Sequence, residues 1–229
     1  MILFALTTVS WAASPESYKI HFSTYALRPL DTANLYYQNA PESYTELTFR
    51  KKSRSDLHQA TIQTSDAALR IFRKRDLPNG SEEYLPAGLT KVPQDKTQWL
   101  LLLTDNPKQP GMVRAYVIED SSTNFPKGSI RVANVTGVET IGKINTTAVN
   151  ISNGATSQAF QTGVKETVDI SVAAKGDSRY HLLYKNTIRI TSGSRGLLIL
   201  TPPIRKGSIR IGGHLLLESP NEVKDAPPL

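Results

Sequence analysis

The sequence predicts an all-β protein of two tandem antiparallel β-sandwich domains of the immunoglobulin-like kind. Its 229 residues suffice for two domains of about a hundred residues, each with its own core. Thr, Ser, Val, Ile and Tyr are frequent, and 14 Gly and 14 Pro interrupt the chain, a combination that favours strands and turns. No stretch has the apolar spacing of an amphipathic helix over three turns, and one hairpin pattern occurs twice.

The first domain is predicted over residues 16–121. Short alternating or apolar segments predict its strands, and turn clusters such as Asp76–Ser81 separate them. The predicted strands are Tyr18–Tyr25, Ala33–Gln38, Glu46–Arg50, Ala68–Lys74, Trp99–Leu103 and Val113–Glu119.

The second domain is predicted over residues 126–217, and we expect the chain to divide in the Ser/Thr/Asn/Pro segment Glu119–Lys127. Residues 218–229, from Glu218 onward, are rich in Pro and charge and are expected to form a flexible tail. The predicted strands are Ser129–Asn134, Glu139–Ile144, Ala148–Ile151, Glu166–Ala173, His181–Tyr184, Thr187–Thr191, Leu197–Leu200 and Ser208–Ile211.

A repeated hairpin indicates domain duplication. Residues 99–114 and 196–210 both contain four aliphatic residues and a Thr, then a loop with Pro and Lys, then Gly and an apolar-Arg pair. So short an aliphatic run is typical of a strand buried on both faces or at the centre of a sandwich. The pentapeptide KGSIR also occurs twice, at Lys127–Arg131 and at Lys206–Arg210. The first copy lies at the start of a predicted domain and the second near the end of one, so the hairpin is the better sign of a repeat.

The N-terminus predicts a signal peptide over residues 1–13, truncated because no Lys or Arg precedes the apolar run Met1–Val9. Ser10–Ala12 or Trp11–Ala13 supplies the small residue that signal peptidase requires. The alternative is the first strand of a cytosolic fold. The signal interpretation predicts that N-terminal sequencing of protein from the native host finds the first 13 residues removed.

The chain has no cysteine, which excludes disulfides, thiolate nucleophiles and metal sites with sulfur ligands. No other apolar stretch has the length of a membrane-spanning helix, so we expect no span in the mature chain. An exported bacterial protein fits this composition, in the periplasm or outside the cell.

No catalytic, cofactor or metal site is predicted. His21, His58, His181 and His214 lie far apart, and no zinc-protease motif, nucleophile elbow or phosphate-binding loop occurs. Adjacent carboxylates such as Glu82 and Glu83 point to opposite faces of a strand and cannot share one substrate atom. We therefore expect a protein that is not an enzyme.

Charge predicts a binding surface on the second half, where residues 126–229 hold 13 Lys and Arg against 7 Asp and Glu. In three predicted strands an Arg stands between aliphatic residues, so period-2 alternation directs it outward. The candidate basic surface comprises Arg131, Arg189, Arg205, Lys206 and Arg210. Such a surface suits an anionic polymer or an acidic protein patch; the alternative is a merely solvated face.

A secondary basic loop is predicted at Arg50, Lys51, Lys52 and Arg54. Aromatic residues hardly interleave with these charges, so we predict no nucleic-acid partner. Four Asn-x-Ser/Thr sequons, at Asn79, Asn134, Asn145 and Asn150, matter only in a eukaryotic secretory pathway and arise readily by chance in such a chain.

Residues 124–136, NFPKGSIRVANVT, resemble a phrase found in uncharacterised exported bacterial tandem β-sandwich proteins. The stretch is also similar to the domain-opening strand of the periplasmic accessory proteins of alginate acetylation, whose length and duplicated layout resemble this chain. The resemblance covers little more than a dozen residues and transfers no functional residue. It implies a non-catalytic partner of a cell-envelope or polysaccharide system.

Two functional hypotheses follow. The first is an exported accessory or adaptor protein that binds an envelope protein or anionic polysaccharide through its sandwich surfaces. The alternative is a structural spacer or adhesin-type surface protein with no dedicated ligand. A stoichiometric partner recovered from the native periplasm distinguishes the first from the second, and the sequence leaves the oligomeric state open.

Overall fold

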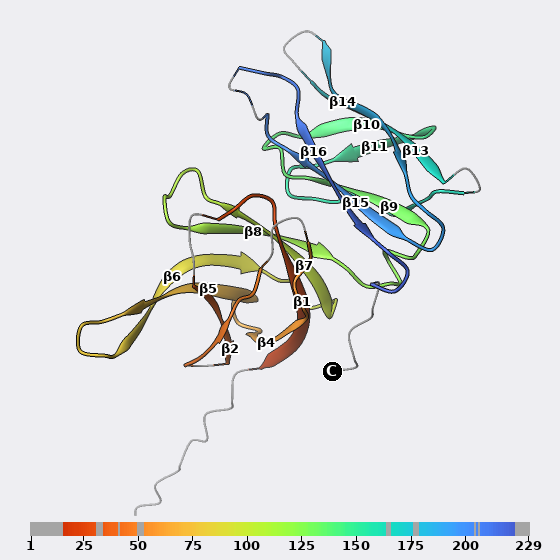
Figure 1. Ribbon diagram of the computed structural model, residues 1–229. Helices are drawn as coiled ribbons and strands as arrows, with labels where there is room; N and C mark the ends of the chain where they lie inside the picture. Colours follow the sequence, from red (N-terminus) through yellow and green to blue (C-terminus); the bar gives the residue numbers. More distant parts are fainter. Residues whose placement is uncertain are drawn as a thin grey trace, which may run out of the picture.

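A computed structural model describes residues 16–30, 34–40, 42–49, 53–163, 166–175, 179–203, 205 and 207–222. Within these ranges the structure has strands and no helix, and the strands form four sheets of four strands each. The sheets make two β-sandwich-like lobes that follow one another along the chain (Figure 1). The all-β prediction is therefore confirmed.

The first sandwich uses eight strands in two sheets, with orders β4-β1-β7-β8 and β3-β2-β5-β6. Within the first of these sheets β1 pairs with β7 in parallel, and the other pairings are antiparallel. The strands are β1 (Ser17–Ala26), β2 (Leu35–Ala40), β3 (Ser43–Glu46), β4 (His58–Gln63), β5 (Ala68–Asp76), β6 (Glu82–Lys91), β7 (Gln98–Asp105) and β8 (Val113–Glu119).

The second sandwich repeats this topology strand for strand, with orders β12-β9-β15-β16 and β11-β10-β13-β14 and with β9 parallel to β15. Residues 99–114 of the predicted repeat therefore cover β7 and the start of β8, whereas residues 196–210 cover the equivalent β15 and the loop that leads into β16. The strands are β9 (Ser129–Asn134), β10 (Thr140–Ile144), β11 (Thr147–Ile151), β12 (Phe160–Gln161), β13 (Thr167–Lys175), β14 (Tyr180–Arg189), β15 (Arg195–Thr201) and β16 (Gly212–Glu218).

Each sandwich encloses its own apolar core between its two sheets. Ile20, Leu69 and Leu101 belong to the first core, and Val132, Ile170 and Leu198 belong to the second. These residues alternate along their strands with residues of the opposite face, as the pleat of a strand requires.

A third apolar cluster joins the two sandwiches. It includes Leu100 and Leu102 of β7, Leu197 and Ile199 of β15, and Phe125 of the connection between the lobes. In each four-residue aliphatic run, every second residue faces the core of its own sandwich, and the residues between face the other sandwich. Both strands are therefore buried on both faces.

Several predicted strands differ from those observed. Of the predicted strand Glu46–Arg50, the described part contributes Glu46 alone to a strand, as the end of β3. The strands β4, β6 and β12 were not predicted, and β14 replaces two predicted strands. Residues 208–211 were predicted as a strand but lie in the loop before β16. The loop is misleading because its Ser-Ile-Arg-Ile pattern alternates like a strand.

The connection and the expected tail also differ from expectation. Asp120 and Phe125 are buried, so the segment proposed for cleavage contributes to the interior. Glu218 does not begin a tail; it is the last residue of β16 and is buried. The predicted signal peptide and residues 223–229 lie outside the described residues.

Candidate functional site

Arg131, predicted to project from a basic face, is buried at 7 % exposure in the middle of β9. Its guanidinium donates to the Glu119 carbonyl at 2.8 Å and to the Ser157 carbonyl at 3.0 Å. Burial lowers the pKa of Arg131, an effect that Glu119 and Asp120 oppose. Arg131 does point away from the core of the second sandwich, as alternation along β9 predicts. The first sandwich covers that face, however, so the prediction that Arg131 is exposed was wrong.

Arg189 lies on β14, which belongs to the other sheet of the second sandwich. It is exposed, and its Nη2 lies 3.5 Å from Glu166 Oε2. Arg131, Arg189 and Arg210 therefore do not project from one sheet, and the predicted continuous face is not formed.

Arg205 and Arg210 do come together, in the loop that leads into β16. With Ser208, Ile211 and Gly212 they line a hollow of about 270 Å³. Both guanidinium groups are on exposed residues, and the Ser208 hydroxyl fixes the loop by accepting from the Arg210 backbone at 3.0 Å. We call this feature the arginine hollow; Lys206, its predicted neighbour, lies outside the described residues.

The arginine hollow is attached to the second core. The Ile211 amide donates to the Leu183 carbonyl of β14 at 3.3 Å, and the Ile211 side chain packs against the core. The loop thus has an anchored base and an exposed, cationic tip. No ion pair between described side chains engages Arg205 or Arg210.

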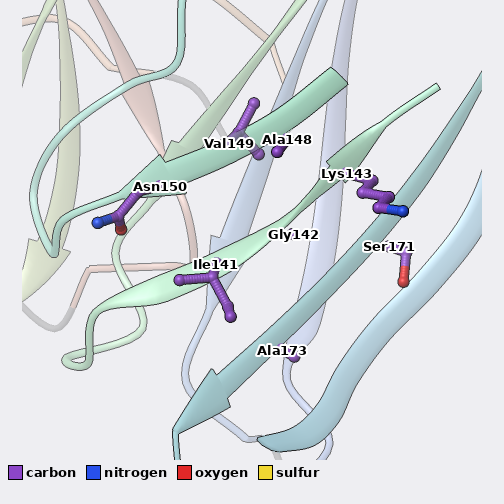
Figure 2. Close-up of a pocket in the computed structure, with 8 residues that line it drawn as sticks. All are labelled: Ile141, Gly142, Lys143, Ala148, Val149, Asn150, Ser171 and Ala173. Carbon is purple, nitrogen blue, oxygen red and sulfur yellow. The ribbon is translucent and has the colours of Figure 1, made fainter. Parts of the chain in front are cut away.

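A second, larger hollow of about 590 Å³ lies on the outer face of the β11-β10-β13-β14 sheet. Figure 2 shows small and aliphatic side chains across it, with Lys143 beside Ser171. Ser171 is opposite both Lys143 and Lys185 in the strand register, so two exposed lysines flank it. The lining residues are Ile141, Gly142, Lys143, Ala148, Val149, Asn150, Ser171 and Ala173.

Four charged residues that we did not predict as a group meet where the sandwiches join. Arg54 pairs with Asp120, and its Nε lies 2.5 Å from Glu218 Oε1. Arg195 Nη2 lies 3.1 Å from Asp120 Oδ1, and its Nε lies 2.6 Å from Glu218 Oε2. We call Arg54, Asp120, Arg195 and Glu218 the junction cluster.

The junction cluster alternates positive and negative groups at a largely buried place. Arg195 and Asp120 are each 2 % exposed, and the Arg195 guanidinium also lies over the Phe125 ring at 4.7 Å. Arg54 is therefore part of an interior network rather than of an exposed basic loop; Arg50, Lys51 and Lys52 lie outside the described residues. The sequence signal was the charge at each end of the β15–β16 hairpin, where Arg195 pairs with Glu218.

Two of the histidines belong to strands of the first sandwich. His58 stacks on Phe22 with ring centroids 5.1 Å apart, and desolvation lowers the pKa of both His58 and His21. Among the described residues no three His, Cys, Asp or Glu side chains are grouped to hold a metal ion. The described part of the chain also has no helix of the length and apolarity that crossing a membrane requires.

Comparison with known proteins gives no family assignment. No protein family model matches this sequence, and none of the curated proteins is detectably similar to it. The functional interpretation therefore depends on the geometry of the chain itself.

Proposed function

We propose that the chain is a non-catalytic, exported binding protein of the cell envelope that holds an anionic partner with its second sandwich. The observation that carries this proposal is the arginine hollow. Its two exposed cations lie in the loop before β16, close to Ile211, which contacts the second core.

Carboxylates suit this hollow best. Two guanidinium groups offer forked donors that match carboxylate oxygens, and a carboxylate-rich chain can engage both groups together. The exposed Lys143 and Lys185 on the opposite sheet raise the positive potential of the same sandwich, which speeds encounter with a polyanion.

Export and the immunoglobulin-like character of the sandwiches belong to the same proposal. The apolar N-terminus with its small residues at 12 and 13 supports secretion, and the absence of cysteine fits a bacterial periplasmic or extracellular location. The resemblance of residues 124–136 to exported tandem β-sandwich proteins supports an accessory role in the envelope.

A structural spacer is the second candidate function. The apolar cluster between the sandwiches and the junction cluster favour it, because together they hold the two lobes in one arrangement. A spacer requires no ligand, so binding measurements separate the two functions.

The first test measures binding of polyglutamate and of polygalacturonate to the full chain at low ionic strength. We expect both to bind and the double variant R205Q/R210Q to bind roughly tenfold more weakly, because an exposed charge pair contributes up to about 1 kcal/mol. Added salt should weaken wild-type binding more steeply than that of the variant.

The matched control is R75Q/K108Q, which removes two exposed cations from the first sandwich. It lowers the net charge equally, so any general electrostatic effect appears in both double variants. Equal losses in the two variants, or no binding by wild type, would refute the arginine hollow as the binding site and favour the spacer.

A further inference from the structure

The two sandwiches differ at one corresponding edge. In the first sandwich β6 lies along β8: the Thr90 hydroxyl donates to the Ala115 carbonyl at 3.2 Å, and a Cβ on Gly88 would lie 2.7 Å from the Val113 carbonyl oxygen. The equivalent strands of the second sandwich, β14 and β16, do not come together over a comparable length. The repeated topology therefore provides an internal comparison: β14 and β16 of the second sandwich pack together less closely than β6 and β8 of the first.

The opening leaves apolar side chains of β16 uncovered. Leu215 and Leu217 are 39 % and 44 % exposed, although they lie on the face that Leu198 of β15 directs into the second core. In the first sandwich the residues of β8 at the same ladder positions are Val117, which packs against the first core, and the half-buried Glu119. The uncovered side chains thus belong to the core side of the sheet and not to a solvated face.

The edge of β16 also lacks the usual protection against pairing. Edge strands are commonly protected by charges or Pro, and β6 has Pro86 while β14 has Lys185. In β16 the only Asp, Glu, Lys or Arg is Glu218, which is buried in the junction cluster. No backbone–backbone hydrogen bond between described residues involves 212–218 outside the β15–β16 ladder.

The opening begins beside the arginine hollow. At the start of β16 the Tyr184 ring covers Gly213, where an added Cβ would lie 2.6 Å from the ring. Beyond that point Leu215 and Leu217 are uncovered, whereas Arg210 lies just before the strand. A strand of about eight residues spans Arg210 to Leu217 at about 3.4 Å per residue.

We propose that β16 accepts an extended peptide strand of a partner protein, with alternating apolar residues that cover Leu215 and Leu217 and with carboxylates at the end that meets Arg205 and Arg210. This proposal rests on the proposed function and names the class of its anionic partner. Backbone hydrogen bonds to the edge supply affinity, and the apolar and acidic positions supply selectivity.

Charge and shape favour a peptide over other occupants. A polysaccharide can neutralise the two arginines but offers no row of amide donors and carbonyl acceptors to the strand edge. A second copy paired through β16 would cover the leucines and leave its arginine hollow without an acid, because β16 itself contains only the buried Glu218.

The test uses two ten-residue probes of alternating Val and Thr, with two Asp at the N-terminal end in one and at the C-terminal end in the other. We expect one probe to bind the full chain and to slow amide hydrogen exchange at residues 212–218; the better probe gives the strand direction. The double variant L215S/L217S should weaken that probe about tenfold or more, because each lost leucine removes apolar area that the peptide would bury. The matched variant Y180S/L182S, which removes two exposed apolar residues of β14, should not.

Two further probes carry N-methyl groups on alternate amides, one on the odd-numbered and one on the even-numbered residues. They separate strand addition from simple apolar contact, and we expect at least one of them to lose binding. Equal binding by both methylated probes, or unchanged binding by L215S/L217S, overturns strand addition. A wild-type chain that is already dimeric, and becomes monomeric in L215S/L217S, shows that a second copy occupies the edge. The proposed function can hold even if the peptide proposal fails. That result would be polyglutamate binding by L215S/L217S that still depends on Arg205 and Arg210.

Discussion

At the scale of single residues, we expect the stability of the fold to depend most strongly on the charges of the junction cluster. Replacing Arg195 with Met keeps much of the side-chain volume but leaves Asp120 and Glu218 buried with Arg54 alone. We expect R195M to lower the free energy of unfolding by about 3 kcal/mol, since an uncompensated buried charge is costly. Urea unfolding measures this, with exposed Arg189→Met as the control, which should change stability by less than about 0.5 kcal/mol. Similar small effects of both variants would mean that the cluster contributes little.

Two histidines of the first sandwich, the buried His21 and the half-buried His58, predict a pH dependence of stability. Desolvation holds the pKa of His58 and His21 below the ordinary value of 6.5, so the unfolded chain binds protons that the folded chain does not. Their contribution is present above about pH 6.5 and is lost as pH falls through the folded pKa values. His58→Gln should therefore lose less stability between about pH 8 and 5.5 than wild type in urea titrations. An identical loss in both proteins would contradict this assignment.

At the scale of secondary structure elements, the close approach of β10 to β13 depends on one glycine. A Cβ added at Gly142 would collide with the Ser171 backbone carbonyl, so Gly142→Ala must displace one strand of the sheet in Figure 2. We expect a loss of about 1–3 kcal/mol in the free energy of unfolding, as for overpacked sites. Ala148→Val, on the exposed neighbouring strand, is the control and should be nearly neutral. A neutral Gly142→Ala would show that β10 moves freely.

How well each element was predicted follows from what surrounds it. The runs Leu100–Leu103 and Leu197–Leu200 were predicted as strands that are buried on both faces or lie at a sandwich centre, and the structure buries both faces of each. Arg131 was misplaced because alternation shows which way a residue points from its own sheet, and not whether a second sandwich covers that face. Arg205 and Arg210 were predicted to share a basic surface and do lie together, but Arg210 was expected on a strand and lies in a loop. The junction cluster was not predicted, because its four members come from four separate segments of the chain.

At the scale of the whole molecule, the two sandwiches are expected to unfold together. Separating them would expose Leu100, Leu102, Leu197 and Ile199 to water and break the junction cluster. This replaces the expectation of an early cleavage at Glu119–Lys127, because Asp120 and Phe125 of that segment are buried. Hydrogen exchange across a urea titration should show β7 and β15 losing protection at the same midpoint. Two well-separated midpoints would show that the lobes are independent.

The central claim is that the second sandwich, held in place by the first, binds an anionic partner at the loop before β16. Hydrogen exchange of the full chain with and without polyglutamate tests it most directly, because it locates the bound surface without a substitution. We predict slower exchange at the amides of residues 207–218, which include Ser208 and Arg210, and little change across β1 to β8. Protection confined to the first sandwich, or no protection at a saturating concentration of polyglutamate, would contradict the claim.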